Sequence, residues 1–256
     1  MKFSVNWKLF VILLIASFIT TIMVLPYTLA LSPAVAKDFT PLVLIAQLIQ
    51  SFVIFLIAIF IGLILYKRVG FNLPILEGWL EGKEVSSYLK SILGISIGLG
   101  VLSALIIIFL SFLFTPVSGI FQSASVSVPS WKAFLACFYG GIGEEILLRL
   151  FLMTLIVWIL FKIRKTADGK PTVIGIWLAI IISAVIFGLG HLPITGTLTA
   201  ITPLVIVRAV LLNGVAGIIF GWLYWKKGLE SAMISHFSAD IVLQVIFPFV
   251  LAQLII

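Results

Sequence analysis

Long apolar segments separated by short, charged loops constrain this chain more than any other feature of its sequence. Of its 256 residues, 62% are hydrophobic and 10% are charged, whereas a soluble domain is typically about 45–50% apolar and about 25% charged. A helix needs about 20 apolar residues to cross a bilayer. Seven segments reach this length: Leu9–Leu31, Leu42–Tyr66, Tyr88–Phe114, Trp131–Phe161, Val173–His191, Pro203–Tyr224 and Ser231–Ile256. We therefore expect an all-α fold, a polytopic integral membrane helix bundle.

The number of spans depends on the fourth segment, which is too long for one plain crossing. The pair Gly140-Gly141 predicts a break, with an interfacial helix over Trp131–Tyr139 before the span proper. If that first piece also inserts, the bundle has eight spans instead of seven. The first segment is too long for a signal peptide and lacks a small-residue cleavage site, so we expect it to stay as an anchor.

Basic residues predict the orientation of the bundle. They gather at the N-terminus and in alternate loops, namely at Lys2, Lys8, Lys67, Arg68, Lys83, Lys90, Lys162, Arg164, Lys165, Lys170, Lys226 and Lys227. The other loops carry only Lys37 and Lys132. By the positive-inside rule, we expect a multi-pass protein of the cell membrane with a cytoplasmic N-terminus and an external C-terminus. The net charge of +7 thus reflects topology and lipid contact, and charge split among short loops does not indicate a nucleic-acid partner.

A few polar residues nevertheless lie inside the apolar segments. They are Glu144, Glu145, Arg149, His191, Arg208, Asn213, His236 and Asp240. A charged side chain at the bilayer centre costs roughly 2.5–3.5 kcal/mol even on insertion scales, so such residues indicate a functional site. The single cysteine, Cys137, excludes an internal disulfide and a cysteine-based zinc site. We interpret it as a small packed hydrophobe.

Helical spacing assigns partners to some of these residues. Glu145 and Arg149 are four apart with the acid first, so they can pair along one helix face. Glu144 is turned by about 100° from Glu145 and cannot share that pairing equally. We therefore expect Glu145 to be neutralised structurally and Glu144 to point into a cavity as a general base or acid. His236 and Asp240 also share a face, so the carboxylate could orient the imidazole or bind something with it.

Two chemistries use this set of histidines and carboxyls. In a metal-dependent site, Glu144, His191, His236 and Asp240 would be ligands of a divalent, zinc-like ion with water in an open position. In a metal-free site, Glu144 and His191 would activate a water, and His236 and Asp240 would stabilise the oxyanion of a tetrahedral intermediate. Both end in hydrolysis of an amide, and the residues alone leave both open.

Three short motifs resemble those of the CPBP intramembrane proteases, also called the CAAX-prenyl-protease or Abi type. They are Glu-Glu-x-x-x-Arg at 144–149, Phe-x-x-x-His at 187–191 and His-x-x-x-Asp at 236–240. The resemblance covers residues 131–256, which we expect to be the catalytic transmembrane core. Residues 1–130 match only in being hydrophobic, and we expect them to form N-terminal transmembrane helices and loops.

The resemblance implies an endopeptidase that cleaves a membrane-associated protein or peptide reaching the site from the membrane. It implies that Glu144 and His191 activate water, that Glu145, Arg149 and Phe187 support the site, and that His236 and residue 240 stabilise the oxyanion or bind metal. Family members that process CAAX proteins have Asn at position 240, whereas this chain has Asp. An ionised Asp cannot donate a hydrogen bond to an oxyanion, so the metal question stays open.

A proton-coupled transporter or a non-catalytic membrane scaffold is the alternative, because intramembrane Glu, His, Asp and Arg also form proton relays. A further expectation concerns depth. If every span crosses fully, His191 lies near the outer end of its span and His236 near the inner end. The two then meet only if the sixth span is short or displaced, or if the Lys226–Ser235 segment dips into the bundle. Arg208 and Asn213 match no motif, Glu230 reads as an interfacial charge, and the Ser118–Ser130 stretch reads as an external loop.

Overall fold

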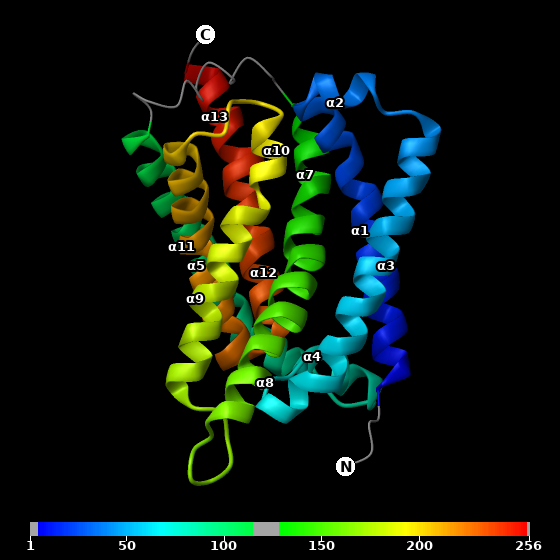
Figure 1. Ribbon diagram of the computed structural model, residues 1–256, viewed down its shortest axis with the longest axis vertical. Helices are drawn as coiled ribbons and strands as arrows, with labels where there is room; N and C mark the ends of the chain where they lie inside the picture. The colour runs from blue at the N-terminus through cyan, green and yellow to red at the C-terminus, as the bar shows by residue number, and fades with distance from the viewer. Residues whose placement is uncertain (1–4, 115–127, 255–256) are drawn as a thin grey trace.

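The computed structural model describes residues 5–114 and 128–254, and these residues form helices joined by loops, without a strand. In this part of the chain, seven helical spans are long and apolar enough to cross a membrane. They stand side by side in one bundle (Figure 1). The expected all-α membrane bundle is thereby confirmed. The external loop expected at Ser118–Ser130 falls mostly outside the described residues.

The seven spans run along the chain as follows. The first three are α1 (Trp7–Leu31), α3 (Pro41–Leu65) continued by the 3-10 turn η1 (Tyr66–Val69), and α5 (Ser86–Leu113). The fourth comprises α7 (Ser130–Phe138), the π-helical segments η3 (Tyr139–Glu144) and η4 (Ile146–Met153), and α8 (Thr154–Ile163). The last three are α9 (Val173–Gly190) with α10 (Leu192–Gly196), α11 (Pro203–Lys227), and α12 (Leu229–Asp240) with η5 (Ile241–Ile246) and α13 (Phe247–Leu254). Two short helices, α2 (Pro33–Lys37) and α4 (Pro74–Leu80), lie between spans.

Polar caps determine where several spans begin. The side chain of Asn6 accepts a hydrogen bond from the Leu9 N–H at 3.1 Å. Thr172 and Thr202 accept the corresponding N–H groups at the starts of α9 and α11. Each cap satisfies one of the backbone donors that a helix start leaves unpaired. The apolar segments of the sequence therefore begin as helices at defined residues.

The fourth span is a single continuous helix, so the predicted break at Gly140-Gly141 is wrong. The two glycines lie in the π-helical segment η3, against α12. A Cβ atom on Gly140 would collide with the Asp240 carboxylate, and one on Gly141 would lie 2.9 Å from the Phe237 Cβ. The glycines thus permit close approach of the seventh span. A π-helix carries an extra residue per turn and occurs frequently at functional sites.

Small residues also bring α9 and α11 together. A Cβ atom on Gly217 would lie 2.8 Å from the Ala184 Cβ, and one on Gly221 would lie 3.2 Å from Ile180. Packing at small residues is the usual way for helix backbones to approach in a membrane. Gly214, on the same helix, has nothing within 4 Å of its would-be Cβ atom and takes no part in this contact.

The turn between α11 and α12 lies against the loop that contains α4. The N–H of Leu229 donates to the Asn72 carbonyl at 3.2 Å. The Glu230 Oε1 atom accepts from the N–H groups of Ile75 and Leu76 at 3.0 and 2.9 Å. Glu230 is thus a buried cap of α4, and its interpretation as an interfacial charge is wrong. Helix α12 begins on top of this loop, inside the bundle.

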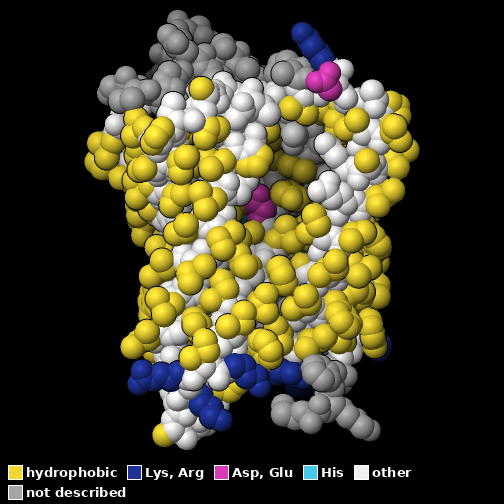
Figure 2. Space-filling view, in the orientation of Figure 1, with side chains coloured by type: hydrophobic (Ala, Val, Ile, Leu, Met, Phe, Trp, Pro, Cys, Tyr) yellow, Lys and Arg dark blue, Asp and Glu magenta, His cyan; other side chains and the backbone are white. Residues whose placement is uncertain are grey.

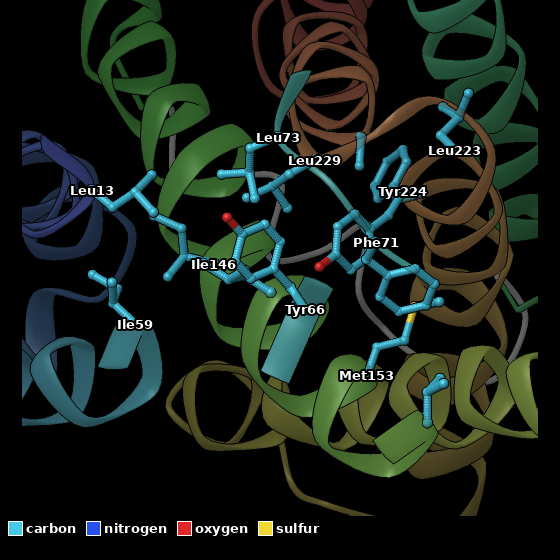
Figure 3. Packing of buried hydrophobic residues seen from close by; sticks show 14 of the residues in the cluster. Leu13, Ile59, Tyr66, Phe71, Leu73, Ile146, Met153, Leu223, Tyr224 and Leu229 are labelled. Carbon is cyan, nitrogen blue, oxygen red and sulfur yellow. The ribbon is translucent and has the colours of Figure 1, made fainter. Parts of the chain in front are cut away.

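An apolar core fills the end of the bundle that carries the basic loops. Tyr66, Phe71, Met153, Tyr224 and Leu229 belong to it, and Figure 3 shows them packed together with residues from neighbouring helices. The Tyr224 side chain is fully buried, and its hydroxyl pairs with the Thr154 hydroxyl at 3.0 Å. This core therefore joins the second, fourth, sixth and seventh spans beneath the polar residues.

Candidate functional site

A cavity of about 400 Å³ receives the polar residues of three spans. Glu144 on η3, His191 after α9, and His236 and Asp240 on α12 all line it. Figure 2 shows an acidic side chain within a hollow of an otherwise apolar face. His191 and His236 therefore meet in one cavity, which the depth argument allowed only if a span were short or displaced or if the Lys226–Ser235 segment dipped into the bundle. Within that segment, Leu229, Ser231, Ala232 and Ser235 are fully buried.

Glu145 and Arg149 form a fully buried ion pair below the cavity. The Arg149 Nη1 atom donates to Glu145 Oε1 at 2.9 Å, as the four-residue spacing predicts. Its Nη2 atom donates to the Gly217 carbonyl at 3.0 Å, and the Phe187 and Phe220 rings lie 5.2 and 5.4 Å from the guanidinium. Arg149 thus donates to a carboxylate of its own span and to a backbone carbonyl of α11. The pair connects the fourth span to the sixth.

The same glutamate also orients His236. Glu145 Oε1 lies 2.7 Å from His236 Nδ1, and the imidazole stacks on the Phe220 ring at 4.6 Å between centroids. A carboxylate oxygen paired with Arg149 accepts, so Nδ1 carries the proton and donates. Glu145, and not Asp240, therefore makes the hydrogen bond to this imidazole, across 91 positions of sequence. Nε2 of His236 is left facing the cavity.

Two carboxylates lie opposite that free nitrogen. Glu144 Oε2 is 3.7 Å and Asp240 Oδ2 is 3.8 Å from His236 Nε2. These distances exceed a direct hydrogen bond, and a polar gap of this width is one that a water commonly bridges. Glu144 is the most open of the three, with 22% of its side chain exposed. Its freedom from Arg149, which pairs with Glu145, agrees with the unequal roles expected for the two adjacent glutamates.

His191 enters the cavity from the end of the fifth span. Its Nδ1 atom lies 2.9 Å from the Phe187 carbonyl. A carbonyl only accepts, so Nδ1 carries a proton and Nε2 of the neutral ring is an acceptor. The Phe187 ring packs edge-on against both His191 and His236, at 4.8 and 5.6 Å between centroids. Phe187 thus positions the two imidazoles by packing.

The cavity also contains polar residues that no sequence motif indicated. Tyr27, Tyr139, Asn213 and Gln244 line it. The Asn213 amide donates to the Ala209 carbonyl at 2.9 Å. Gln244 could have been suspected, because it lies four residues after Asp240 on the same helical face. Tyr27 could not, since only the packing of α1 against the fourth span brings it here.

The four residues that one of the two alternatives assigns to a zinc-like ion, Glu144, His191, His236 and Asp240, line the cavity together. Among the described residues, no group of three or more His, Cys, Asp or Glu side chains is arranged so that it could hold a metal ion. The Nδ1 atoms of both histidines are engaged, one by Glu145 and the other by the Phe187 carbonyl. The remaining donors fit a bridging water at the distances found. Arg208 does not line the cavity.

Comparison with known proteins gives one match. Residues 126–242 match the family described as Rce1-like, type II CAAX prenyl endopeptidase. This segment contains all three motifs and every polar residue of the cavity except Tyr27, Thr28 and Gln244. No curated protein and no solved structure matches the chain significantly. The match is consistent with the CPBP, or CAAX protease, family.

Proposed function

From the match of residues 126–242 to the Rce1-like family of type II CAAX prenyl endopeptidases, we propose that this chain hydrolyses a peptide bond with Glu144 as general base. The substrate is a membrane-associated protein or peptide. The protein lies in the cell membrane with its N-terminus on the cytoplasmic side.

One observation carries the proposal: Glu144, His191, His236 and Asp240 line a single cavity, while Glu145 is occupied by Arg149 and His236. A general base needs to be within reach of the proton it abstracts, directly or through one water. Of the two adjacent carboxylates, only Glu144 meets the cavity. If Arg149 paired equally with both glutamates, neither carboxylate would be free to act as a general base.

In the proposed mechanism, Glu144 and His191 activate the water. The Glu144 carboxylate accepts a proton from a water held in the cavity, as the water oxygen adds to the scissile carbonyl carbon. Nε2 of His191, the acceptor nitrogen of the neutral ring, holds the second hydrogen of that water. When the C–N bond breaks, the protonated Glu144 returns its proton to the leaving nitrogen. A positioned acid–base group of this kind contributes about 10²–10⁴-fold to a rate.

His236 stabilises the developing oxyanion. In its imidazolium form both nitrogens donate, so Nδ1 stays on Glu145 while Nε2 donates to the oxyanion. Asp240 is an acceptor when ionised. It lies 3.8 Å from Nε2 and compensates the charge of the imidazolium instead of donating to the oxyanion. Preorganised donors aimed at developing charge supply much of the acceleration in such sites.

Membrane-fraction proteomics of cells that express the wild type or Glu144→Gln tests this function. Glu81→Gln, an exposed carboxylate in a loop between spans, is the matched control for the same chemical change. The proposal expects one or more precursors to accumulate with Glu144→Gln and not with Glu81→Gln. Identical peptide sets in all three samples, at equal protein levels, would remove its support.

A further inference from the structure

The cavity does not lie midway along the fourth span. Along this span, Glu144 lies 19 residues before Ile163, where the basic loop begins, and 14 residues after Ser130 at the opposite end. Basic side chains gather at one end of the bundle in Figure 2. His191 is likewise about 27 Å from Val173, which follows a basic loop. Glu144 and His191 thus lie toward the end of the bundle that carries few basic residues.

The side of the cavity that faces the basic loops is closed. Phe220 and the Arg149–Glu145 pair form its floor, all without solvent exposure. Beneath them lies the apolar core of Tyr66, Phe71, Met153, Tyr224 and Leu229. The turn at Gly228 and the buried carboxylate of Glu230 then seal α12 onto the α4 loop. This path is filled with packed side chains.

The opposite side of the cavity is lined by residues near the other helix ends. On α1 these are Val24, Tyr27, Thr28 and Leu31, the last residues of the helix. Ile107 lies toward the corresponding end of α5, and Ile194 lies on α10, past His191. Further lining residues, Leu243 and Gln244, follow Asp240 in the same direction. Every wall therefore continues away from the basic loops.

From this asymmetry we infer that substrate enters the site from the face opposite the basic loops. By the positive-inside rule, which places Lys- and Arg-rich loops in the cytoplasm, that face is external. The inference concerns access, and it does not depend on what the site does.

Combined with the proposed function, on which this step rests, the access route defines the substrate class. The scissile bond belongs to an extended peptide segment on the external side, close to where its chain leaves the membrane. The walls contributed by α1 and α10 are mostly apolar, with the Tyr27 hydroxyl among them. They suit a segment whose side chains are apolar, so that its backbone amides can reach the polar residues of the cavity. A cytoplasmic tail would meet the closed side instead.

Cysteine labelling tests the route without requiring activity. Cys137 is fully buried and donates only to the Ala133 carbonyl, so Cys137→Ser keeps that hydrogen bond and removes the native thiol. In this background, Thr28→Cys and Ile194→Cys report on the cavity wall. Ala167→Cys, in the exposed hairpin of a basic loop, and Thr197→Cys, in the exposed turn after α10, report on the two faces. A membrane-impermeant maleimide is applied to sealed vesicles, and then to detergent-solubilised protein.

We expect Thr28→Cys and Ile194→Cys to react from the side on which Thr197→Cys reacts, and Ala167→Cys to react only from the other side. Reaction of either wall cysteine from the Ala167 side overturns the inference. So does protection of both wall cysteines from the Thr197 side when both react after solubilisation. If the labelling is as expected but Glu144→Gln leaves all precursors unchanged, the proposed hydrolysis fails and the access route stands.

Discussion

Glu145 Oε1 lies 2.7 Å from His236 Nδ1 and 2.9 Å from Arg149 Nη1, so one buried oxygen holds the imidazole and the guanidinium together. The glutamate that would be classified as a folding residue from its spacing therefore also fixes the geometry of the site. Glu145 provides something different to each partner: a negative charge to Arg149 and a hydrogen-bond acceptor to His236.

Substitution of Glu145 should distinguish the contribution of its negative charge from that of its acceptor oxygen. Glu145→Gln retains an acceptor oxygen but leaves Arg149 without a counter-charge, and breaking a buried pair in this way costs about 3–5 kcal/mol. We expect a lower unfolding temperature in detergent together with a loss of activity. The double variant Glu145→Gln/Arg149→Met removes the unpaired charge and should regain part of the stability. Equal stability of wild type and Glu145→Gln would contradict the clamp.

Addition of one methyl group at Gly140 should impair the site more than the fold. Its Cβ atom would collide with the Asp240 carboxylate and lie 3.1 Å from His236 Nε2. Overpacking typically costs about 1–3 kcal/mol, so Gly140→Ala should fold, with activity reduced at least about tenfold. Gly214→Ala, where nothing lies within 4 Å, is the control and should be neutral. Activity per folded molecule decides the comparison.

The role of Asp240 can be tested by changing its charge and its hydrogen-bonding groups. Asp240→Asn replaces an acceptor by an amide that can donate to the oxyanion, whereas Asp240→Ala offers neither. Because Asp240 is proposed to act through its negative charge, which both variants remove, we expect each of them to lose about 10²–10³ in kcat, the magnitude typical for an electrostatic stabilising group. Turnover of a substrate identified by proteomics measures both. If the Asn variant stays within about tenfold of the wild type while the Ala variant is inactive, an amide donor is sufficient and the charge is not required.

Glu230 should affect stability through the α4 cap. Glu230→Ala leaves the N–H groups of Ile75 and Leu76 without their acceptor, and an unsatisfied buried donor costs about 1–3 kcal/mol. Glu230→Gln keeps an amide oxygen in place and should lose less. Thermal unfolding in detergent distinguishes them. Comparable unfolding temperatures for Ala and wild type would show that the cap contributes nothing to stability.

Hydropathy and spacing were sufficient for the parts of the structure that depend on local sequence. The seven spans follow from runs of apolar residues, and the Glu145–Arg149 pair follows from four-residue spacing on one helix. The contact between Glu145 and His236 could not be predicted in this way, because 91 positions separate them. The same holds for Tyr27, which reaches the cavity only through tertiary packing of α1.

Backbone features explain the remaining errors. The Gly140-Gly141 pair was expected to break the helix, but the contacts with Asp240 and Phe237 hold it in a π-helical winding. The depth of His236 was misjudged because hydropathy does not show that α12 starts on the α4 loop. In both places the structure is determined by what the segment packs against, which a single apolar run does not encode.

The π-helical winding of residues 139–153 has a consequence for comparing this chain with its relatives. Such a segment amounts to an α-helix with an inserted residue. A relative that lacks one residue here could form a plain α-helix and keep the residues before and after the deletion on the same faces, because the wider π turn accommodates the extra residue. Alignments of this span therefore need to allow single-residue gaps inside a transmembrane helix. Without them, the acidic motif and the apolar face that follows it will be matched out of register.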